Sequence, residues 1–198
     1  TPPTADYPLG LTTTYAYDAK HNLTTITDPK TQTYLTNVYD QTEDRVTSQT
    51  YGTGTSTLTY GQDAGGNDQT TVLDRKGFQT LWTFNATGNP TKQESFTQGI
   101  RLGDPPSYIT QWTYNTNLEQ TLLTLPRGNA IQYTYDDLNP DPKAHGNLLE
   151  LRRKPPSGSI EPDLVTSFTY ESNYQFPKTI TDPRGNVTTY TYDYDLGE

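Results

Sequence analysis

A short string of residues recurs along the chain and constrains its fold more than any other feature. Six copies have a bulky residue, a threonine, an aromatic residue and then a small polar or acidic residue, as in Tyr133-Thr134-Tyr135-Asp136, and two looser copies have Ala16 or Val38 in place of the threonine. The second aromatic residues of successive copies are Tyr17, Tyr39, Tyr60, Phe84, Tyr114, Tyr135, Tyr170 and Tyr192. The steps between them are 22, 21, 24, 30, 21, 35 and 22 residues. A base period of this size, lengthened by insertions, indicates a tandem repeat.

Each copy of the string predicts one β-strand. Residues i and i+2 of a strand point to the same face, so the two aromatic residues share one face and the threonine points to the other. A polar turn follows, such as 18–22, and then a second strand-like run, such as 118–125. That run ends at a second breaker, which we expect to reverse the chain. These return turns are marked by Pro29, Gly77, Pro126, Gly128, Pro183 and Gly185.

The sequence therefore predicts an all-β chain of tandem antiparallel β-hairpins, with one hairpin and one return turn per repeat. Its 38 threonines and 16 tyrosines suit a pleated sheet and argue against disorder, although the mean hydropathy is only -0.87. We expect a lead-in segment at residues 1–10 and about eight repeats over residues 11–198. Inserts rich in Pro and Gly near 99–108, 137–146 and 154–163 predict long loops and not domain boundaries.

Charge and composition exclude several classes of function. The net charge of -9 repels phosphate backbones and anionic lipid surfaces, so we expect no nucleic-acid partner. No apolar run is long enough for a membrane span. The chain has no cysteine, which removes disulfides and thiolate chemistry. It begins at Thr1 and has no methionine, so we expect a piece of a longer precursor whose export signal lies elsewhere.

The repeat resembles a known family. The aromatic-Thr-Tyr-Asp string, a polar turn, a strand and then Asp-Pro-Arg-Gly-Asn at 182–186 is similar to the tyrosine-aspartate (YD) repeat of bacterial Rhs-type proteins, toxin complex shell components, wall-associated bacterial proteins and teneurins. The resemblance covers roughly residues 11–198. It implies a curved, spiralling continuous sheet, part of a YD shell that in several members encloses a toxic polypeptide. The acidic position is occupied by Asp18, Asp40, Asp136, Glu171 and Asp193, whereas Gly61, Asn85 and Asn115 depart from the pattern.

Candidate catalytic residues are better explained as turn residues. His21 and His145 fall in predicted turns with no nucleophile or metal-ligand spacing beside them. The acidic residues of the repeats follow the strand aromatic at one fixed position, which is typical of side chains that bond the turn backbone. We therefore predict no catalytic residue, no metal site and no cofactor.

Two further features of the sequence resemble ligand-binding motifs. The string 137–141 copies the opening spacing of an EF-hand calcium loop, but Pro142 stands where that loop requires glycine and Leu148 where it requires glutamate. Trp82 and Trp112 are the candidate glycan contacts, since exposed tryptophans stack on sugar rings. Both occupy the first aromatic position of the repeat, which favours shared packing instead.

The sequence favours a non-enzymatic structural repeat module of a secreted or cell-surface protein, forming the wall of a shell or an extracellular assembly. The alternative is a surface adhesin or carbohydrate-binding module that uses exposed aromatics. A hydrolase is the third class, and no carboxylate pair outside the repeat positions supports it. Expected partners are further YD repeats of the same longer chain or copies of itself, including filaments or tubes, together with an encapsulated toxin polypeptide or surface glycans.

Overall fold

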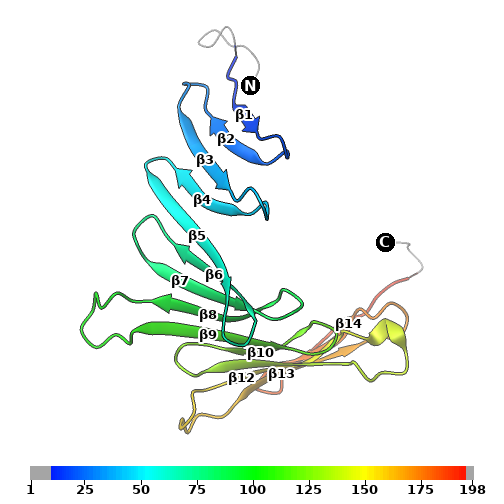
Figure 1. Ribbon diagram of the computed structural model, residues 1–198. Helices are drawn as coiled ribbons and strands as arrows, with labels where there is room; N and C mark the ends of the chain where they lie inside the picture. Colours follow the sequence, from blue (N-terminus) through cyan, green and yellow to red (C-terminus); the bar gives the residue numbers. More distant parts are fainter. Residues whose placement is uncertain (1–9, 195–198) are drawn as a thin grey trace. The chain divides into compact units, whose positions relative to one another are not determined.

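A computed structural model describes residues 10–194. Within that range the chain forms fifteen strands and one 3-10 helix (Figure 1). The strands are β1 Thr14–Tyr17, β2 Leu23–Thr27, β3 Thr33–Tyr39, β4 Val46–Tyr51, β5 Gly54–Gln62, β6 Asp68–Leu73, β7 Gln79–Phe84, β8 Pro90–Phe96, β9 Ser107–Tyr114, β10 Gln120–Thr124, β11 Ala130–Tyr135, β12 Leu148–Lys154, β13 Leu164–Tyr170, β14 Pro177–Thr181 and β15 Val187–Thr189. The helix η1 spans Pro142–Ala144. No helix in the described range has the length and apolar content needed to cross a membrane.

The strands form one antiparallel sheet whose spatial order is the chain order, from β1 to β15. Each strand is therefore joined to its neighbour by a turn at one edge of the sheet and to its other neighbour by a turn at the opposite edge. This confirms the predicted all-β array of tandem hairpins. Thr83 and Ala144 are the only described residues that are buried, and no large side chain is fully enclosed.

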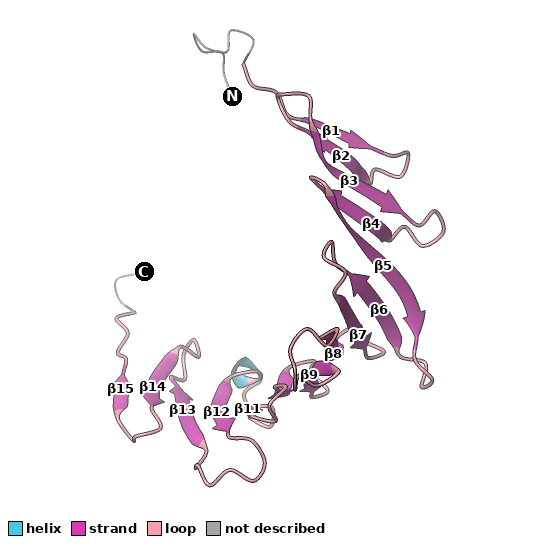
Figure 2. Cartoon of the chain, turned by 90° about the vertical axis from the view of Figure 1, so that its left-hand side faces the viewer, coloured by secondary structure: helices cyan, strands magenta, loops and turns pink. Residues whose placement is uncertain are grey.

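The chain divides into two compact units. The first comprises Thr1–Gly88 and Glu94–Tyr108, and the second comprises Asn89–Gln93 and Ile109–Glu198. Within each unit the strands lie in a single layer (Figure 2). The three inserts form the long connections 97–106, 136–147 and 155–163. Of the expected lead-in segment, residues 1–9 lie outside the described residues.

The two faces of the single layer differ in exposure. In β5 the side chains alternate, with Leu58 and Tyr60 half-buried and Thr57 and Thr59 exposed. Threonines on the exposed face pair across strands through their hydroxyl groups, at distances of 2.6–3.0 Å. Because the described strands of each unit lie in a single layer, backbone ladders, turns and contacts between neighbouring strands must hold each unit together.

Eight turns share one backbone geometry. The N–H of the first residue donates to the carbonyl of the fifth in most of them, and the N–H of the fourth donates to the carbonyl of the first in all of them. This is the three-residue hairpin loop with a left-handed fourth residue. The first residue is Asp or Asn in seven turns, and its side chain accepts a further backbone N–H from the third residue. The first residues are Asp18, Asp28, Asp63, Asp74, Asn85, Asn115, Leu125 and Asp182.

The left-handed fourth position is glycine in five of these turns and a residue with a side chain in three. Thr31 has φ 64°, and His21 and Leu118 have φ 68° and 65°. A Cβ atom in this region costs about 1–2 kcal/mol per residue, and a β-branched residue suits it least. The return turns with glycine at this position include Gly77, Gly128 and Gly185. Pro126 and Pro183 are the second residues of two of these turns, whereas Pro29 is the second residue of the turn that has Thr31 at the fourth position.

We predict that Thr31→Gly raises the free energy of unfolding by about 1 kcal/mol, because glycine removes the strain at a positive φ. Urea denaturation followed by circular dichroism measures the change. The matched control is Gly185→Ala at the equivalent position, where φ is 83° and no atom lies within 4 Å of the added Cβ, so only backbone strain is introduced. That variant should lose stability. A loss on Thr31→Gly would contradict the account and would assign the larger effect to the bond from the Thr31 hydroxyl to the Lys30 carbonyl.

Candidate functional site

The second aromatic residue of each repeat makes a hydrogen bond that ties one strand to its neighbour. In six repeats the tyrosine hydroxyl donates to the backbone carbonyl of the residue that begins the preceding strand, at 2.7–3.0 Å. The donor and acceptor pairs are Tyr39–Leu23, Tyr60–Val46, Tyr114–Pro90, Tyr135–Gln120, Tyr170–Leu148 and Tyr192–Pro177. The bond satisfies a carbonyl at the end of the ladder and fixes the tyrosine ring across two strands.

Two repeats lack this bond. Phe84 ends β7 without a hydroxyl group, and the hydroxyl of Tyr17 has no partner among the described residues. Desolvation raises the pKa of Tyr114, Tyr135 and Tyr170 above its ordinary value, which shows that the rings are partly shielded where the bond forms. The sequence placed these tyrosines on one face but did not reveal their acceptors.

Longer turns are linked to the neighbouring turn at the same edge. Lys20 Nζ donates to the carbonyl of Gln41 at 2.8 Å and lies 3.5 Å from the Asp44 carboxylate, and Asn22 Nδ2 donates to Asp44 at 2.6 Å. Asp44 has φ 60°, a strained backbone conformation, and its side chain contacts Lys20 and Asn22 of the preceding repeat.

Side-chain hydrogen bonds also link neighbouring turns in the second unit. Gln175 has φ 61° and accepts from Asn147 Nδ2 at 2.9 Å. Asp137 accepts from Asn115 and Asn117 at 2.9 and 3.1 Å. Asp137 opens the string that was compared with a calcium loop, and its carboxylate is thus held by amide groups of the preceding turn. No group of three or more metal-ligating residues occurs between residues 10 and 194.

Hydrogen bonds within the turns lower the pKa of four carboxyl groups, those of Asp18, Asp40, Glu171 and Asp182. Although burial raises it, the pKa of Glu171 falls to about 2 because the backbone N–H groups of Phe176, Asn173 and Tyr174 and the hydroxyl of Tyr194 donate to the carboxylate. Burial and this same hydrogen bond raise the pKa of Tyr194 to about 12.

Turns of the ordinary repeats show the same effect. The backbone N–H of Asn22 lowers the pKa of Asp18, and that of Glu43 lowers the pKa of Asp40. Asp136 instead opens the long connection with η1 and accepts from the Asn139 amide at 2.7 Å. Asp193 follows β15 and is exposed.

The residue just before each acceptor of a tyrosine–carbonyl bond can pack against the ring of the tyrosine that makes this bond. The guanidinium of Arg45 lies 4.3 Å from the centre of the Tyr60 ring. The ring of Phe176 lies 5.1 Å from that of Tyr192, in the same relation to its own turn. Two chemically different residues therefore fill one slot of the repeat. Tyr174 and Tyr194 extend the second contact into a cluster of four partly exposed rings.

The remaining candidate residues lie apart from one another. Trp82 lies in β7 and Trp112 in β9, and both are half-buried. His21 is the left-handed residue of an exposed turn. The ring of His145 contacts the carbonyl of Asn139 at 2.7 Å beside η1. The structure brings none of these four into a common site.

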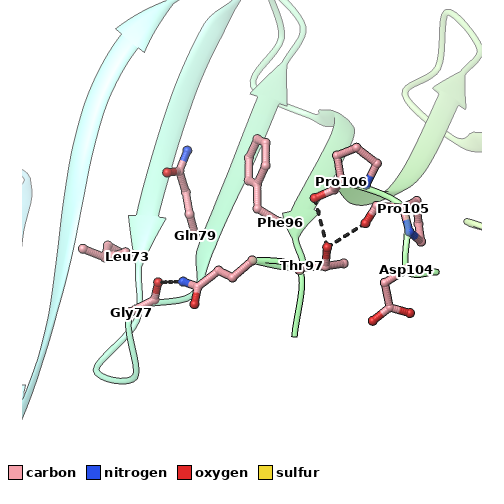
Figure 3. Close-up of a pocket in the computed structure, with 10 residues that line it drawn as sticks. Leu73, Gly77, Gln79, Phe96, Thr97, Asp104, Pro105 and Pro106 are labelled. Atoms are coloured by element: carbon pink, nitrogen blue, oxygen red, sulfur yellow. Dashed lines mark hydrogen bonds between the residues drawn. The ribbon is translucent and has the colours of Figure 1, made fainter. Parts of the chain in front are cut away.

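Open grooves form where an insert lies beside a return turn at the same edge of the sheet. In the first unit, a groove of about 470 Å³ lies between the turn that contains Gly77 and the insert that ends at Pro105-Pro106 (Figure 3). Gln98 donates to the Gly77 carbonyl, and Phe96 forms an apolar wall. In the second unit, a groove of about 400 Å³ lies between the turn that contains Gly128 and the insert that begins at Pro155-Pro156.

This geometry defines a tandem β-hairpin repeat protein. Its recurring feature, the tyrosine–carbonyl bond, links neighbouring strands. Residues 4–33 match the family described as RHS Repeat. The matched segment contains the first aromatic string, with Tyr17 and Asp18, and its return turn. This match over residues 4–33 confirms the predicted resemblance to Rhs-type proteins. No curated protein matches the chain.

Several solved structures are similar to the chain. TcdB2-TccC3-TEV is 10% identical with a TM-score of 0.46, and the match covers 89% of this chain and 10% of that one. TcdB2-TccC3 without its hypervariable C-terminal region is 14% identical with a TM-score of 0.44, covering 92% and 12%. The Photorhabdus luminescens Tc holotoxin pore is 15% identical with a TM-score of 0.42, covering 91% and 12%. The chain thus spans about a tenth of the length of these neighbours.

We predict that Tyr170→Phe lowers the free energy of unfolding by about 1 kcal/mol, because the half-buried Leu148 carbonyl loses its donor while the ring remains. Urea denaturation measures the loss. Tyr17→Phe is the matched control: this hydroxyl has no partner in the described range, so removing it should leave the unfolding midpoint unchanged. Equal effects of the two substitutions would contradict a stabilising role for the tyrosine–carbonyl bond.

We predict that stability falls as the pH drops from about 4.5 toward 2. The pKa values of Asp18, Asp40, Asp182 and Glu171 are lower in the folded chain than their ordinary values of 3.8 and 4.5. Their stabilising effect is therefore complete above the unfolded pKa and is lost as the pH falls through the folded pKa. Thermal unfolding at several pH values tests this, with Glu171→Gln expected to flatten the profile. A stability that does not change between pH 5 and pH 2 would refute it.

Proposed function

We propose that this structural repeat module is a section of the wall of a secreted or cell-surface YD-repeat shell or extracellular assembly. The observation that carries the proposal is the tyrosine–carbonyl bond, which recurs in six repeats of units whose described strands lie in a single layer. Such a sheet gains stability repeat by repeat, which suits a wall of variable length. Its neighbours would be further repeats of a longer chain or copies of itself, and the space it encloses would hold a polypeptide cargo.

The proposed role is mechanical and not enzymatic. Turn hydrogen bonds lower the pKa values of Asp18, Asp40, Asp182 and Glu171 further below neutrality, which is opposite to the raised pKa that a general acid needs. Their side chains already accept backbone N–H groups, which makes them part of the scaffold.

A second candidate function is adhesion through exposed aromatic residues. The cluster of Tyr174, Phe176, Tyr192 and Tyr194 favours it, since its rings are 37–64% exposed. Trp82 and Trp112, which are half-buried within strands, fit a packing role better. A shift of tryptophan fluorescence on adding a polysaccharide would favour adhesion through those two residues, and no shift across a panel of glycans would count against it.

The wall predicts a specific pattern of proteolysis. Leu102, Leu138 and Ile160 each lie fully exposed in one of the three inserts. Thermolysin, which cleaves before large apolar residues, should therefore cut first in the inserts and leave the hairpins intact. Mass spectrometry of the early fragments identifies the cuts.

The double variant Ile100→Asn, Leu102→Asn supplies the control for this digestion, because Ile100 is 66% exposed in the same insert. It should remove the early fragment that ends in the first insert and leave the other two unchanged. Early cuts inside the strands, at rates similar to those in the inserts, would contradict the proposed resistant wall.

A further inference from the structure

The insert between β8 and β9 has an anchored base. The backbone N–H of Thr97 donates to the Pro106 carbonyl at 3.1 Å, at the point where the insert begins and ends. The Thr97 hydroxyl donates to the Pro105 carbonyl at 2.6 Å (Figure 3). The Tyr108 hydroxyl donates to the Asp104 carboxylate at 3.0 Å. These bonds hold the two ends of the insert together without involving the residues at its tip.

The tip of this insert is the tripeptide Ile100-Arg101-Leu102, and all three side chains are exposed. A Cβ atom added at Gly99 or Gly103, the residues that flank the tip, would meet no atom within 4 Å. Two long backbone hydrogen bonds are described at the tip, one donated by the Ile100 N–H at 3.5 Å and one accepted by the Arg101 carbonyl at 3.2 Å. The tip can therefore straighten without opening a strand ladder.

An exposed, straightened segment is what an endopeptidase requires of its substrate. Exposed loop tips are the preferred sites of proteolytic cleavage. An extended peptide can pair with a free strand edge of the protein that binds it, and in trypsin-like serine endopeptidases an aspartate in the specificity pocket selects arginine or lysine before the cut. The peptide bond from Arg101 to Leu102 meets these requirements, because an exposed arginine precedes it and no proline follows it.

The other lysines and arginines of residues 10–194 lie in segments that cannot straighten in this way. Five are in strands and six are in the five-residue turns, where backbone hydrogen bonds join the first and fourth or fifth residues. Of the remaining two, Arg45 lies on the Tyr60 ring and Lys143 is in η1, directly before the buried Ala144. The strand residues are Lys92, Arg152, Arg153, Lys154 and Lys178, and the turn residues are Lys20, Lys30, Arg75, Lys76, Arg127 and Arg184.

A cut at the tip would leave both new ends attached to the protein. Before the cut, Gln98 donates to the Gly77 carbonyl, and after it the Asp104 carboxylate is bonded to Tyr108. The first unit continues past the cut as far as Tyr108, whereas the second unit includes Asn89–Gln93 from before the cut. Each unit is therefore built from both fragments, so we expect the fragments to stay together.

We propose that the tip of this insert is a processing site at which an arginine-specific serine endopeptidase hydrolyses the peptide bond between Arg101 and Leu102. Water supplies the hydroxyl group of the new Arg101 carboxyl group and a proton to the new Leu102 amine, so the step requires no oxidant or cofactor. The product is a two-chain form with an unchanged sheet. This inference goes beyond the proposed structural role and does not depend on it.

Limited digestion of the whole folded chain with trypsin tests the proposal, because trypsin cuts after both lysine and arginine and so compares all the candidate bonds in one experiment. Mass spectrometry should identify residues 1–101 and 102–198 as the first products. They should form at least about tenfold faster than any other fragment, because the other bonds are cut only after local unfolding. On size-exclusion chromatography the cut chain should elute as one species, at the volume of the uncut chain.

Two variants at exposed positions separate this bond from the others. Arg101→Gln should remove the early cut, since the specificity pocket loses its arginine. Arg184→Gln is the matched control, because it removes an exposed arginine from a five-residue turn, and it should leave the early cut unchanged. Neither substitution should alter the thermal midpoint of the chain.

Three results would overturn the proposal. The first is early cutting after a strand or turn residue at a rate similar to that after Arg101. The second is an equal preference for Arg101 when the chain is digested in urea, which would assign the preference to the local sequence and not to the fold. The third is separation of the two fragments under native conditions, which would make the cut destructive. None of these results bears on the stabilising role of the tyrosine–carbonyl bond.

Discussion

In a single-layer sheet every strand has at least one face exposed to solvent. This constraint determines how the register of the strands is set. Only Ala144 and Thr83 are buried among the described residues, so no interior selects the register of the strands. The register is set at the ends of the strands instead. Turn side chains fix the reversal at one end, and the tyrosine hydroxyl fixes the first carbonyl of the neighbouring strand. Both interactions are local, which allows the unit to be repeated.

The repeat tolerates changes in its turns because residues of different types make equivalent contacts at the same repeat position. Arg45 and Phe176 fill the same slot, one by a cation–π contact and the other by ring packing. Asp44 and Gln175 both accept backbone strain at a positive φ and use their side chains to reach the preceding turn. Inserts at the other edge add grooves without changing the ladder, so new surface chemistry can arise on an unchanged scaffold.

The hairpins and turns were predictable from the sequence because the repeat places aromatic and turn residues at fixed intervals. The tyrosine acceptors were not, because they depend on the register and on the irregularities beside Tyr39, Tyr135 and Tyr170, which leave no mark in the residue pattern.

The central claim is that stability resides in each hairpin and not in a shared core. Native-state hydrogen exchange, measured amide by amide at rising denaturant concentration, tests it most directly. The account predicts a different opening free energy for each hairpin, with the strands joined by a tyrosine–carbonyl bond protected more than the pair that ends at Phe84. One opening free energy shared by all strands from β1 to β15 would contradict it and would show that the sheet folds as a single cooperative body.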